Sequence, residues 1–191
     1  MKLWEKGIPT SKLVEQFTVG DDRTYDRALA KYDVLASIAH AKMLGRQSII
    51  SGEESDALVK ALEAYLNTVG QEHFRIEEHF EDIHSKIEAY LIDTLGETGK
   101  KIHTARSRND QVLTAIQLYC KDRLDEVCEK THHFAGVLLH LADTHSSVFM
   151  PGYTHMQVAM PSSFGLWFSA YAETLADDLV SLRAVQHLVD Q

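Results

Sequence analysis

Residues 112–145, VLTAIQLYCKDRLDEVCEKTHHFAGVLLHLADTH, run for 34 residues without a proline and with a single glycine, Gly136. Apolar or small side chains recur in this stretch at alternating spacings of four and three residues: Cys120, Leu124, Val127, Thr131, Phe134, Leu138 and Leu141. This spacing is typical of a helix that packs lengthwise against another helix. We therefore predict one helix about 50 Å long, whose additional apolar residues indicate contacts with several neighbours.

A second long helix is predicted to begin at Ser162 or Ser163 and to continue to the end of the chain. Its apolar side chains again follow a helical spacing: Phe164, Phe168, Tyr171, Leu175, Leu179, Leu182, Val185 and Val189. Residues 146–161, which include a Pro-Gly pair, are predicted to form a loop that joins the two helices into an antiparallel hairpin. Two helices cannot cover their own apolar faces, so we expect the chain to be incomplete or to depend on other chains.

Shorter helices are predicted before residue 100, where Pro9 is the only proline. The first of them follows Asp21 or Asp22, either of which can cap its N-terminus, and ends near Gly45. Its predicted apolar stripe consists of Tyr25, Leu29, Tyr32, Leu35, Ala39 and Met43. We expect this stripe to face the core.

Two more helices complete this part of the chain. Ser51 and Glu54 form an S-x-x-E capping box that opens the first of them, and Gly70 is its predicted end. Its core face is predicted to carry Leu58, Leu62, Tyr65 and Val69. The other helix extends from Glu81 to about Thr94. It is predicted to bury Ile83, Ile87 and Leu91.

The predicted fold is therefore all-α, with an N-terminal helical domain over residues 1–110 and a partial central helical-bundle domain over residues 111–191. The composition, 45% hydrophobic and 25% charged, is that of a globular protein. A net charge of -9 argues against non-specific binding to nucleic acid or to anionic membranes. The sequence shows neither a signal peptide nor an apolar run of the roughly 20 residues that span a bilayer, so we expect a cytoplasmic protein.

Residues 100–111, KKIHTARSRNDQ, place six polar side chains where a glycine-broken loop meets the long helix: Arg106, Ser107, Arg108, Asn109, Asp110 and Gln111. Arginine presents a planar fork of donors that matches a carboxylate, and serine and asparagine add neutral donors. The start of the helix adds free backbone N–H groups and the positive end of the helix dipole. The segment is a candidate cradle for a dicarboxylate. An ordinary capped helix start is the alternative, and in an arbitrary sequence it would be the favoured one.

Residues 150–163, MPGYTHMQVAMPSS, place Thr154 and His155 in a nearly uncharged segment between the two long helices. A histidine exchanges protons near neutral pH, and an adjacent hydroxyl can orient it or bind a substrate carboxylate. A histidine that only satisfies backbone carbonyls is the alternative. Chemistry alone leaves both interpretations open.

Residues 81–84, EDIH, form a third candidate segment at the start of a helix. Acidic residues in a first turn stabilise the helix dipole, so capping is the simpler interpretation of this segment in isolation. The sequence contains no zinc-protease motif, phosphate-binding loop, dinucleotide-binding motif or nucleophile elbow. It therefore predicts neither a metal nor a cofactor.

Together these segments resemble the argininosuccinate lyase branch of the fumarase/aspartase superfamily. The resemblance covers essentially the whole chain: LWEKG at residues 3–7, YDR at 25–27, EDIH at 81–84, HTARSRNDQV at 103–112 and PGYTHMQ at 151–157. The S-R-N-D-Q element distinguishes this branch from adenylosuccinate lyases and fumarases. Separated motifs in the right order make a chance match very improbable.

The resemblance implies a carbon–nitrogen lyase that eliminates fumarate from argininosuccinate to leave arginine, the last step of arginine biosynthesis, without a cofactor. It implies a homotetramer whose long helices form a shared bundle, with active sites built by residues of different subunits. By motif position, His155 is the catalytic acid/base residue. The residues implied to bind substrate are Arg106, Ser107, Arg108, Asn109, Thr154, Gln157 and, as a weaker member of the site, His84.

The chain departs from the family pattern in three places. Asp22 stands where many members have a substrate-contacting serine, and Val158 and Met160 stand where an arginine and a glutamine are common. The flexible G-S-S-x-M-P loop, which supplies the serine thought to abstract the proton, does not occur in these residues. We expect the chain alone to be inactive and to self-associate. Two alternatives remain: a non-catalytic helical scaffold derived from the family, and a lyase that acts on another succinylated amine.

Overall fold

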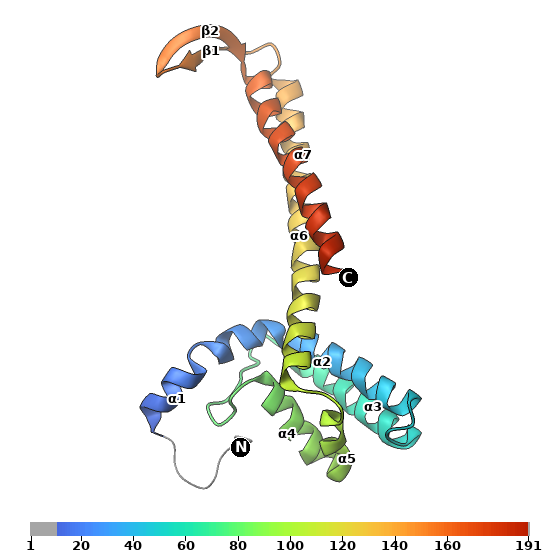
Figure 1. Ribbon diagram of the computed structural model, residues 1–191. Helices are drawn as coiled ribbons and strands as arrows, with labels where there is room; N and C mark the ends of the chain where they lie inside the picture. Colours follow the sequence, from blue (N-terminus) through green and yellow to red (C-terminus); the bar gives the residue numbers. More distant parts are fainter. Residues whose placement is uncertain (1–10, 191) are drawn as a thin grey trace. The chain divides into compact units, whose positions relative to one another are not determined.

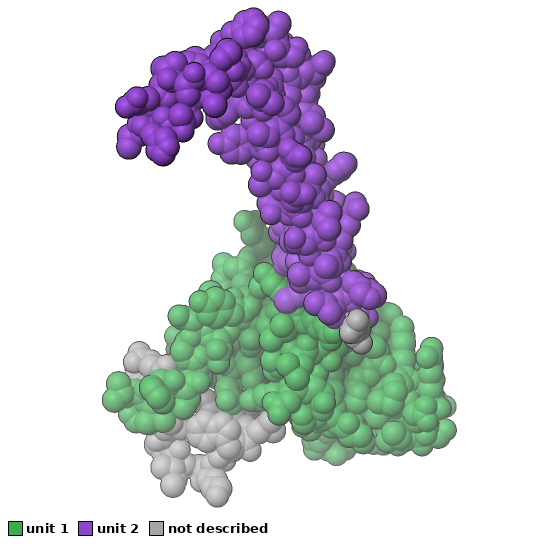
Figure 2. Space-filling model, turned by 45° about the horizontal axis from the view of Figure 1, so that its top comes forward, with its two compact units in different colours: residues 1–119 green, residues 120–191 purple. Residues whose placement is uncertain are grey.

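In the computed structural model, which describes residues 11–190, the chain forms two compact units, residues 1–119 and residues 120–191 (Figure 2). The all-α prediction is confirmed, with one small two-stranded sheet in addition. The LWEKG motif lies outside the described residues. The predicted domain boundary after residue 110 remains a prediction. Within the described part of the chain, no helix combines the length and the apolar character that crossing a membrane requires.

The first unit is built from helices (Figure 1). In chain order they are α1 (Lys12–Val19), α2 (Asp22–Arg46), α3 (Gly52–Val69), α4 (Ile83–Leu95), the short α5 (Glu97–Lys100), the single 3-10 turn η1 (Lys101–His103) and the start of α6 (Arg108–Thr144). Side chains from α2, α3 and α4 form the core. Its most deeply buried large members are Leu44, Leu58, Leu62, Ile83, Ile87 and Leu91. The core faces predicted for α3 and α4 are therefore confirmed.

The N-terminus of α3 carries the predicted capping box. Glu54 N donates to Ser51 Oγ at 3.2 Å, and Ser51 N donates to Glu54 Oε2 at 3.0 Å. The two bonds satisfy backbone N–H groups that have no partner inside the helix. Gly70 is the C-cap, also as predicted.

The apolar stripe predicted for α2 is wrong. Tyr32 is buried, but Tyr25 is 69% exposed and Met43 is 38% exposed. The buried face carries small and polar side chains instead: Ala30, Asp33, Val34, Ser37, Ala41 and Leu44. The reason is the close approach of α3. Ser55 Oγ donates to the carbonyl of Ala41 at 3.0 Å, and a Cβ added at Gly45 would lie 2.7 Å from the Ser55 side chain.

The second unit is a helical hairpin with a two-stranded extension. It contains the rest of α6, strand β1 (Phe149–Thr154), strand β2 (Gln157–Ser163) and α7 (Phe164–Val189), which Ser163 caps as predicted. Near one end of the pair, Gly165 N donates to the carbonyl of His145 at 3.2 Å. Near the other end, Gln186 Nε2 donates to Asp125 Oδ1 at 2.6 Å. The two helices are therefore antiparallel, as expected.

The loop predicted over residues 146–161 is mostly a hairpin. β1 and β2 pair antiparallel, with Phe149 opposite Ser163 and Pro151 opposite Pro161. Phe149, Tyr153 and Thr154 on β1 and Val158 on β2 are aromatic or β-branched residues, which favour extended pairing. The prolines suggested a loop, but each strand of a two-stranded sheet is an edge, where proline is tolerated.

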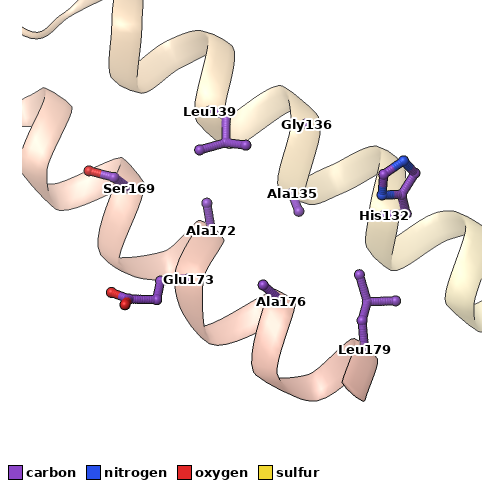
Figure 3. Close-up of a pocket in the computed structure, with 9 residues that line it drawn as sticks. All are labelled: His132, Ala135, Gly136, Leu139, Ser169, Ala172, Glu173, Ala176 and Leu179. Atoms are coloured by element: carbon purple, nitrogen blue, oxygen red, sulfur yellow. The ribbon is translucent and has the colours of Figure 1, made fainter. Parts of the chain in front are cut away.

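A shallow groove of about 450 Å³ lies between α6 and α7 (Figure 3). Small side chains keep it open, among them Ala135, Gly136, Ala172 and Ala176, and Leu139 and Leu179 contribute larger apolar walls. None of the predicted site residues lines this groove.

Gly99 of α5 offers a test of how α5 packs on α4. A Cβ at this position would lie 2.2 Å from the carbonyl oxygen of Leu91, a backbone atom that cannot rotate away. We expect Gly99→Ala to lower the free energy of unfolding by about 1–3 kcal/mol, measured by urea denaturation.

The control is Gly52→Ala at the first position of α3, where nothing lies within 4 Å of an added Cβ. This variant should be neutral or stabilised by less than about 1 kcal/mol. Equal unfolding free energies for the two variants would contradict the close packing of α5 on α4.

Candidate active site

Residues 104–110 enter α6 through a strained turn and a helix cap. Ala105 has a φ of +55°, a left-handed conformation that residues other than glycine seldom adopt. Asp110 N then donates to Ser107 Oγ at 3.4 Å, and Ser107 N donates to Asp110 Oδ2 at 2.8 Å. The hydrogen bonds that the Ser107 backbone N–H and the Ser107 hydroxyl donate to the carboxylate lower the pKa of Asp110.

Arg106 is half-buried against α2. Its Nη1 donates to Ser37 Oγ at 3.0 Å, and the Ser37 hydroxyl in turn donates to Asp33 Oδ1 at 3.5 Å. Burial lowers the pKa of Arg106, and the charge of Asp33 opposes that shift. The guanidinium nevertheless stays charged, as arginine does in proteins. Its buried Nε has no hydrogen-bond partner among the described residues.

Arg108, the first residue of α6, pairs with the N-terminus of α4. Its Nη1 lies 3.0 Å from Asp82 Oδ2 and 3.7 Å from Glu81 Oε1, and its Nη2 donates to Ser85 Oγ at 3.3 Å. Asp82 also caps α4, because its Oδ1 accepts from Ser85 N at 2.8 Å. Capping is thus one role of the EDIH segment, and the capping carboxylate also holds Arg108. The Arg108 side chain is 38% exposed, so a ligand can reach it.

His84 is buried, and its Nδ1 lies 2.8 Å from Asp33 Oδ2. Asp33 itself has no exposed surface. Burial acts to lower the pKa of His84. The hydrogen bond and charge of Asp33, together with the charges of Asp82 and Asp26, outweigh burial, and the pKa is raised. His84 therefore holds a proton to higher pH than a free histidine does.

His40, further along α2, fixes the backbone at the start of the strained turn. Its Nε2 lies 3.0 Å from the carbonyl oxygen of Thr104 and donates to it, because a carbonyl oxygen only accepts. Burial lowers the pKa of His40, and the positive charge of Arg106 lowers it further. The folded protein therefore favours a neutral His40 that carries its hydrogen on Nε2.

His155 and Met156 form the two-residue turn at the tip of the β1–β2 hairpin. Both have a positive φ, +48° and +61°, as a type I′ hairpin turn requires. Thr154 and Gln157 form the last residue pair before the turn. All four are exposed. The hairpin thus presents an imidazole, a hydroxyl and an amide at one exposed tip.

The predicted site residues fall into two sets. In the first unit, His84 and Arg106 are joined through Asp33 and Ser37, whereas Arg108 pairs separately with the start of α4. Asn109 is exposed in the first turn of α6. Thr154, His155 and Gln157 belong to the second unit. In residues 11–190, no cluster of three or more histidine, cysteine, aspartate or glutamate side chains has a geometry that could hold a metal ion.

Sequence reasoning missed three residues of α2 that hold the candidate site in place: Asp33, Ser37 and His40. Their spacing of four and three residues places them on one side of α2, and Asp33 and Ser37 are fully buried there. The sequence does carry a signal for these residues, because polar side chains recur there at helical spacing beside small apolar ones. The aromatic and leucine residues of the predicted stripe masked it.

The model of a family described as Lyase matches residues 5–191. Among curated relatives, the argininosuccinate lyase of Bacteroides thetaiotaomicron is 48% identical over 183 residues, which is 96% of this chain and 41% of the relative. The argininosuccinate lyase of Thermotoga neapolitana is 44% identical over 190 residues, 100% of this chain and 48% of the relative. The chain thus spans about two-fifths to one-half of the length of these relatives.

Solved structures share the fold. EDDS lyase in complex with formate superposes with a TM-score of 0.75 and 25% sequence identity, over 95% of this chain and 36% of that one. A fumarate lyase:delta crystallin from Brucella melitensis in native form superposes with a TM-score of 0.76 and 21% identity, over 92% of this chain and 45% of that one. The likeness to the second structure shows the fold alone.

The raised pKa of His84 predicts a pH-dependent contribution to stability. A group whose pKa is raised on folding stabilises the protein fully below its unfolded pKa, near the ordinary 6.5, and this contribution is lost as the pH rises through the folded pKa. We therefore expect His84→Gln to lower the free energy of unfolding more at about pH 5.5 than at about pH 9, measured by urea denaturation.

His73→Gln, at an exposed histidine between α3 and α4, controls for the chemical change itself. If His84→Gln were equally destabilising at both pH values, the raised pKa would be wrong.

Proposed function

The chain belongs to the lyase family whose model it matches over residues 5–191, and from this we propose that the protein containing it cleaves argininosuccinate into arginine and fumarate. The observation that carries the proposal is the identity of 48% to an argininosuccinate lyase over 96% of this chain. The S-R-N-D-Q element and the P-G-Y-T-H motif lie within the matched length. The reaction is an elimination without a cofactor.

The reaction needs groups that bind carboxylates. A base removes a proton from the carbon beside a carboxylate of the succinyl group, and the resulting carbanion delocalises into that carboxylate. Fixed hydrogen-bond donors stabilise the additional charge. We assign this task to Arg106, Ser107, Arg108 and Asn109. The geometry supports the assignment, because all four lie at the start of α6, where backbone N–H groups and the helix dipole also favour anions.

The reaction also needs an acid that assists departure of the guanidinium nitrogen. His155 is our candidate for the acid/base residue, and Thr154 and Gln157 for substrate contacts beside it. Their position at a hairpin tip supports this role, since an exposed imidazole with no enclosing side chains can reach a substrate held by another element. The other proton-transfer group is expected in the part of the relatives that this chain does not span.

His84 is assigned a supporting role next to the carboxylate-binding arginines. Its buried position and its pairing with Asp33 favour a fixed orientation over direct exposure to solvent. Asp22, the first residue of α2, stands where a substrate-contacting serine is common, and it is exposed. No substrate contact is assigned to it.

We assign a homotetrameric, cytoplasmic enzyme of arginine biosynthesis. The apolar faces of the second unit support association with further helices. Leu139, Leu166, Val180 and Leu188 are each more than half exposed. Monomeric proteins rarely leave contiguous apolar faces in water.

The complete protein is expected to release fumarate from argininosuccinate, and His155→Asn should reduce the turnover rate by about two to four orders of magnitude, the usual effect of removing a general acid or base. Asparagine tolerates a positive φ, so the hairpin turn should persist. Fumarate absorbance measures both rates. Met156→Asn, in the same turn, is the control and should retain near-native turnover. Native-like turnover of His155→Asn would exclude this histidine as the acid/base residue.

Arg108→Lys in the complete protein should lower kcat/KM for argininosuccinate by about 10–100-fold, equivalent to the roughly 1.5–3 kcal/mol of a hydrogen bond to a charged group. Lysine keeps the charge but loses the planar fork. Steady-state kinetics measure the change. Arg46→Lys, on the exposed last turn of α2, is the matched control. An unchanged kcat/KM for Arg108→Lys would show that two-point binding by this arginine is not used.

A further inference from the structure

Two polar side chains on the core side of α2 lie where a helix normally presents apolar residues. Asp33 and Ser37 both have a relative exposure of 0%. Each contacts a different part of the candidate site. Asp33 Oδ2 pairs with Nδ1 of His84, and Ser37 Oγ accepts from Nη1 of Arg106. α2 contributes none of the predicted substrate-binding residues, yet its buried side contacts two of them, His84 and Arg106.

We propose that Asp33 is a positioning residue of the active site, whose buried carboxylate orients the His84 imidazole directly and the Arg106 guanidinium through Ser37. This inference rests on the proposed function. Asp33 is not a catalytic residue in this scheme, since it has no exposed surface through which to contact substrate.

The His84 contact determines which ring nitrogen is available. A carboxylate only accepts hydrogen bonds, so Nδ1 of His84 carries a hydrogen and donates it to Asp33 at 2.8 Å. Nε2 is then the nitrogen left for a second partner. Without Asp33 either tautomer would be open to the imidazole, and the direction of its second hydrogen bond would no longer be fixed.

The Arg106 contact determines where the guanidinium lies. Arg106 follows Ala105, whose left-handed φ is seldom adopted outside glycine, so the turn depends on contacts that hold it in place. Ser37 supplies one of these through the side chain of Arg106, and His40 supplies another through the carbonyl of Thr104. The Ser37 hydroxyl accepts from Arg106 and donates to Asp33, so the carboxylate sets the direction of the hydroxyl.

A purely structural role for Asp33 is the competing explanation. Burying an ion pair seldom stabilises a protein more than a well-packed apolar pair does, so stability alone gives little reason for a carboxylate at this position. A structural role predicts that substitution lowers stability and leaves the kinetics of the folded fraction unchanged. A positioning role predicts that kcat/KM of the folded fraction falls.

The test is Asp33→Asn, which removes the charge and keeps the shape. In the complete protein we expect kcat/KM for argininosuccinate to fall by about 10–100-fold, the effect of a misplaced site residue, at a protein concentration corrected for the folded fraction. Asp56→Asn, the same change at an exposed position of α3, is the matched control and should keep native kinetics. Native kcat/KM in folded Asp33→Asn would overturn the proposal.

An independent measurement follows His84 by NMR in the 191-residue chain with 15N-labelled histidine, where His84→Gln identifies its signal. In Asp33→Asn the titration midpoint of His84 should fall, because burial still disfavours the imidazolium while its main charge partner is gone. Asp26 on α2 and Asp82 at the start of α4 also face His84 and keep part of the upward shift. An unchanged midpoint would overturn the His84 half of the proposal.

Ser37→Ala provides the second variant should Asp33→Asn not fold. It removes the hydroxyl that links Asp33 to Arg106 and keeps the direct contact between Asp33 and His84, so kcat/KM should fall while the His84 midpoint stays in place. Native kinetics in Ser37→Ala would overturn the Arg106 half. Failure of the proposed function gives a different result, since the native protein would then release no fumarate while the NMR titration still reports on Asp33 and His84.

Discussion

The Asp33 carboxylate is a negative charge enclosed in the core of the first unit, with no surface exposed to water. Moving such a group into a protein interior costs several kcal/mol unless polar partners surround it. Its two oxygens find these partners in His84 of α4 and Ser37 of α2. The start of α6 depends on the same elements, because Arg106 binds Ser37 and Arg108 binds the N-terminus of α4. The packing of α2 on α4 therefore also sets the geometry of the candidate site.

The second unit follows a different constraint. α6 and α7 meet along small side chains, and Gly165 is packed so tightly that an added Cβ would lie 2.6 Å from Ser146. This close contact buries little apolar surface, since Leu166 and Val180 stay more than 60% exposed. Two helices of this length gain about 25 cal/mol for each Å² of apolar surface that a neighbour covers. Helices packed on these faces, as in the proposed association, would therefore stabilise the unit.

Local sequence patterns correctly predicted the features that depend on neighbouring residues. They failed for the features that depend on contacts between distant parts of the chain. The cap of α3 is correct because Ser51 and Glu54 are three residues apart and need no other partner. The prediction for the core face of α2 is wrong because α3 approaches closely and leaves room only for small side chains. A pattern based on large apolar residues overlooks such a face. Most of the predicted loop pairs as strands, over residues 149–154 and 157–163, although its prolines are typical of a loop. The candidate arginines were predicted, but their partners were not, because Arg106 and Ser37 are separated by 69 positions in sequence.

The two arginines at the start of α6 are suited to different tasks in the proposed reaction. Arg106 is held by Ser37 behind a strained turn, and its pairing would be costly to rearrange because the group behind it is a buried carboxylate. Arg108 is more than one-third exposed, whereas the side chains of its partners Asp82 and Glu81 are only 12% and 26% exposed. Taking the arginine away would leave poorly solvated carboxylates without their partner, which is costly. In the proposed reaction Arg106 would therefore provide a fixed wall of the site, while Arg108 would keep its ion pairs and meet the substrate through its exposed part.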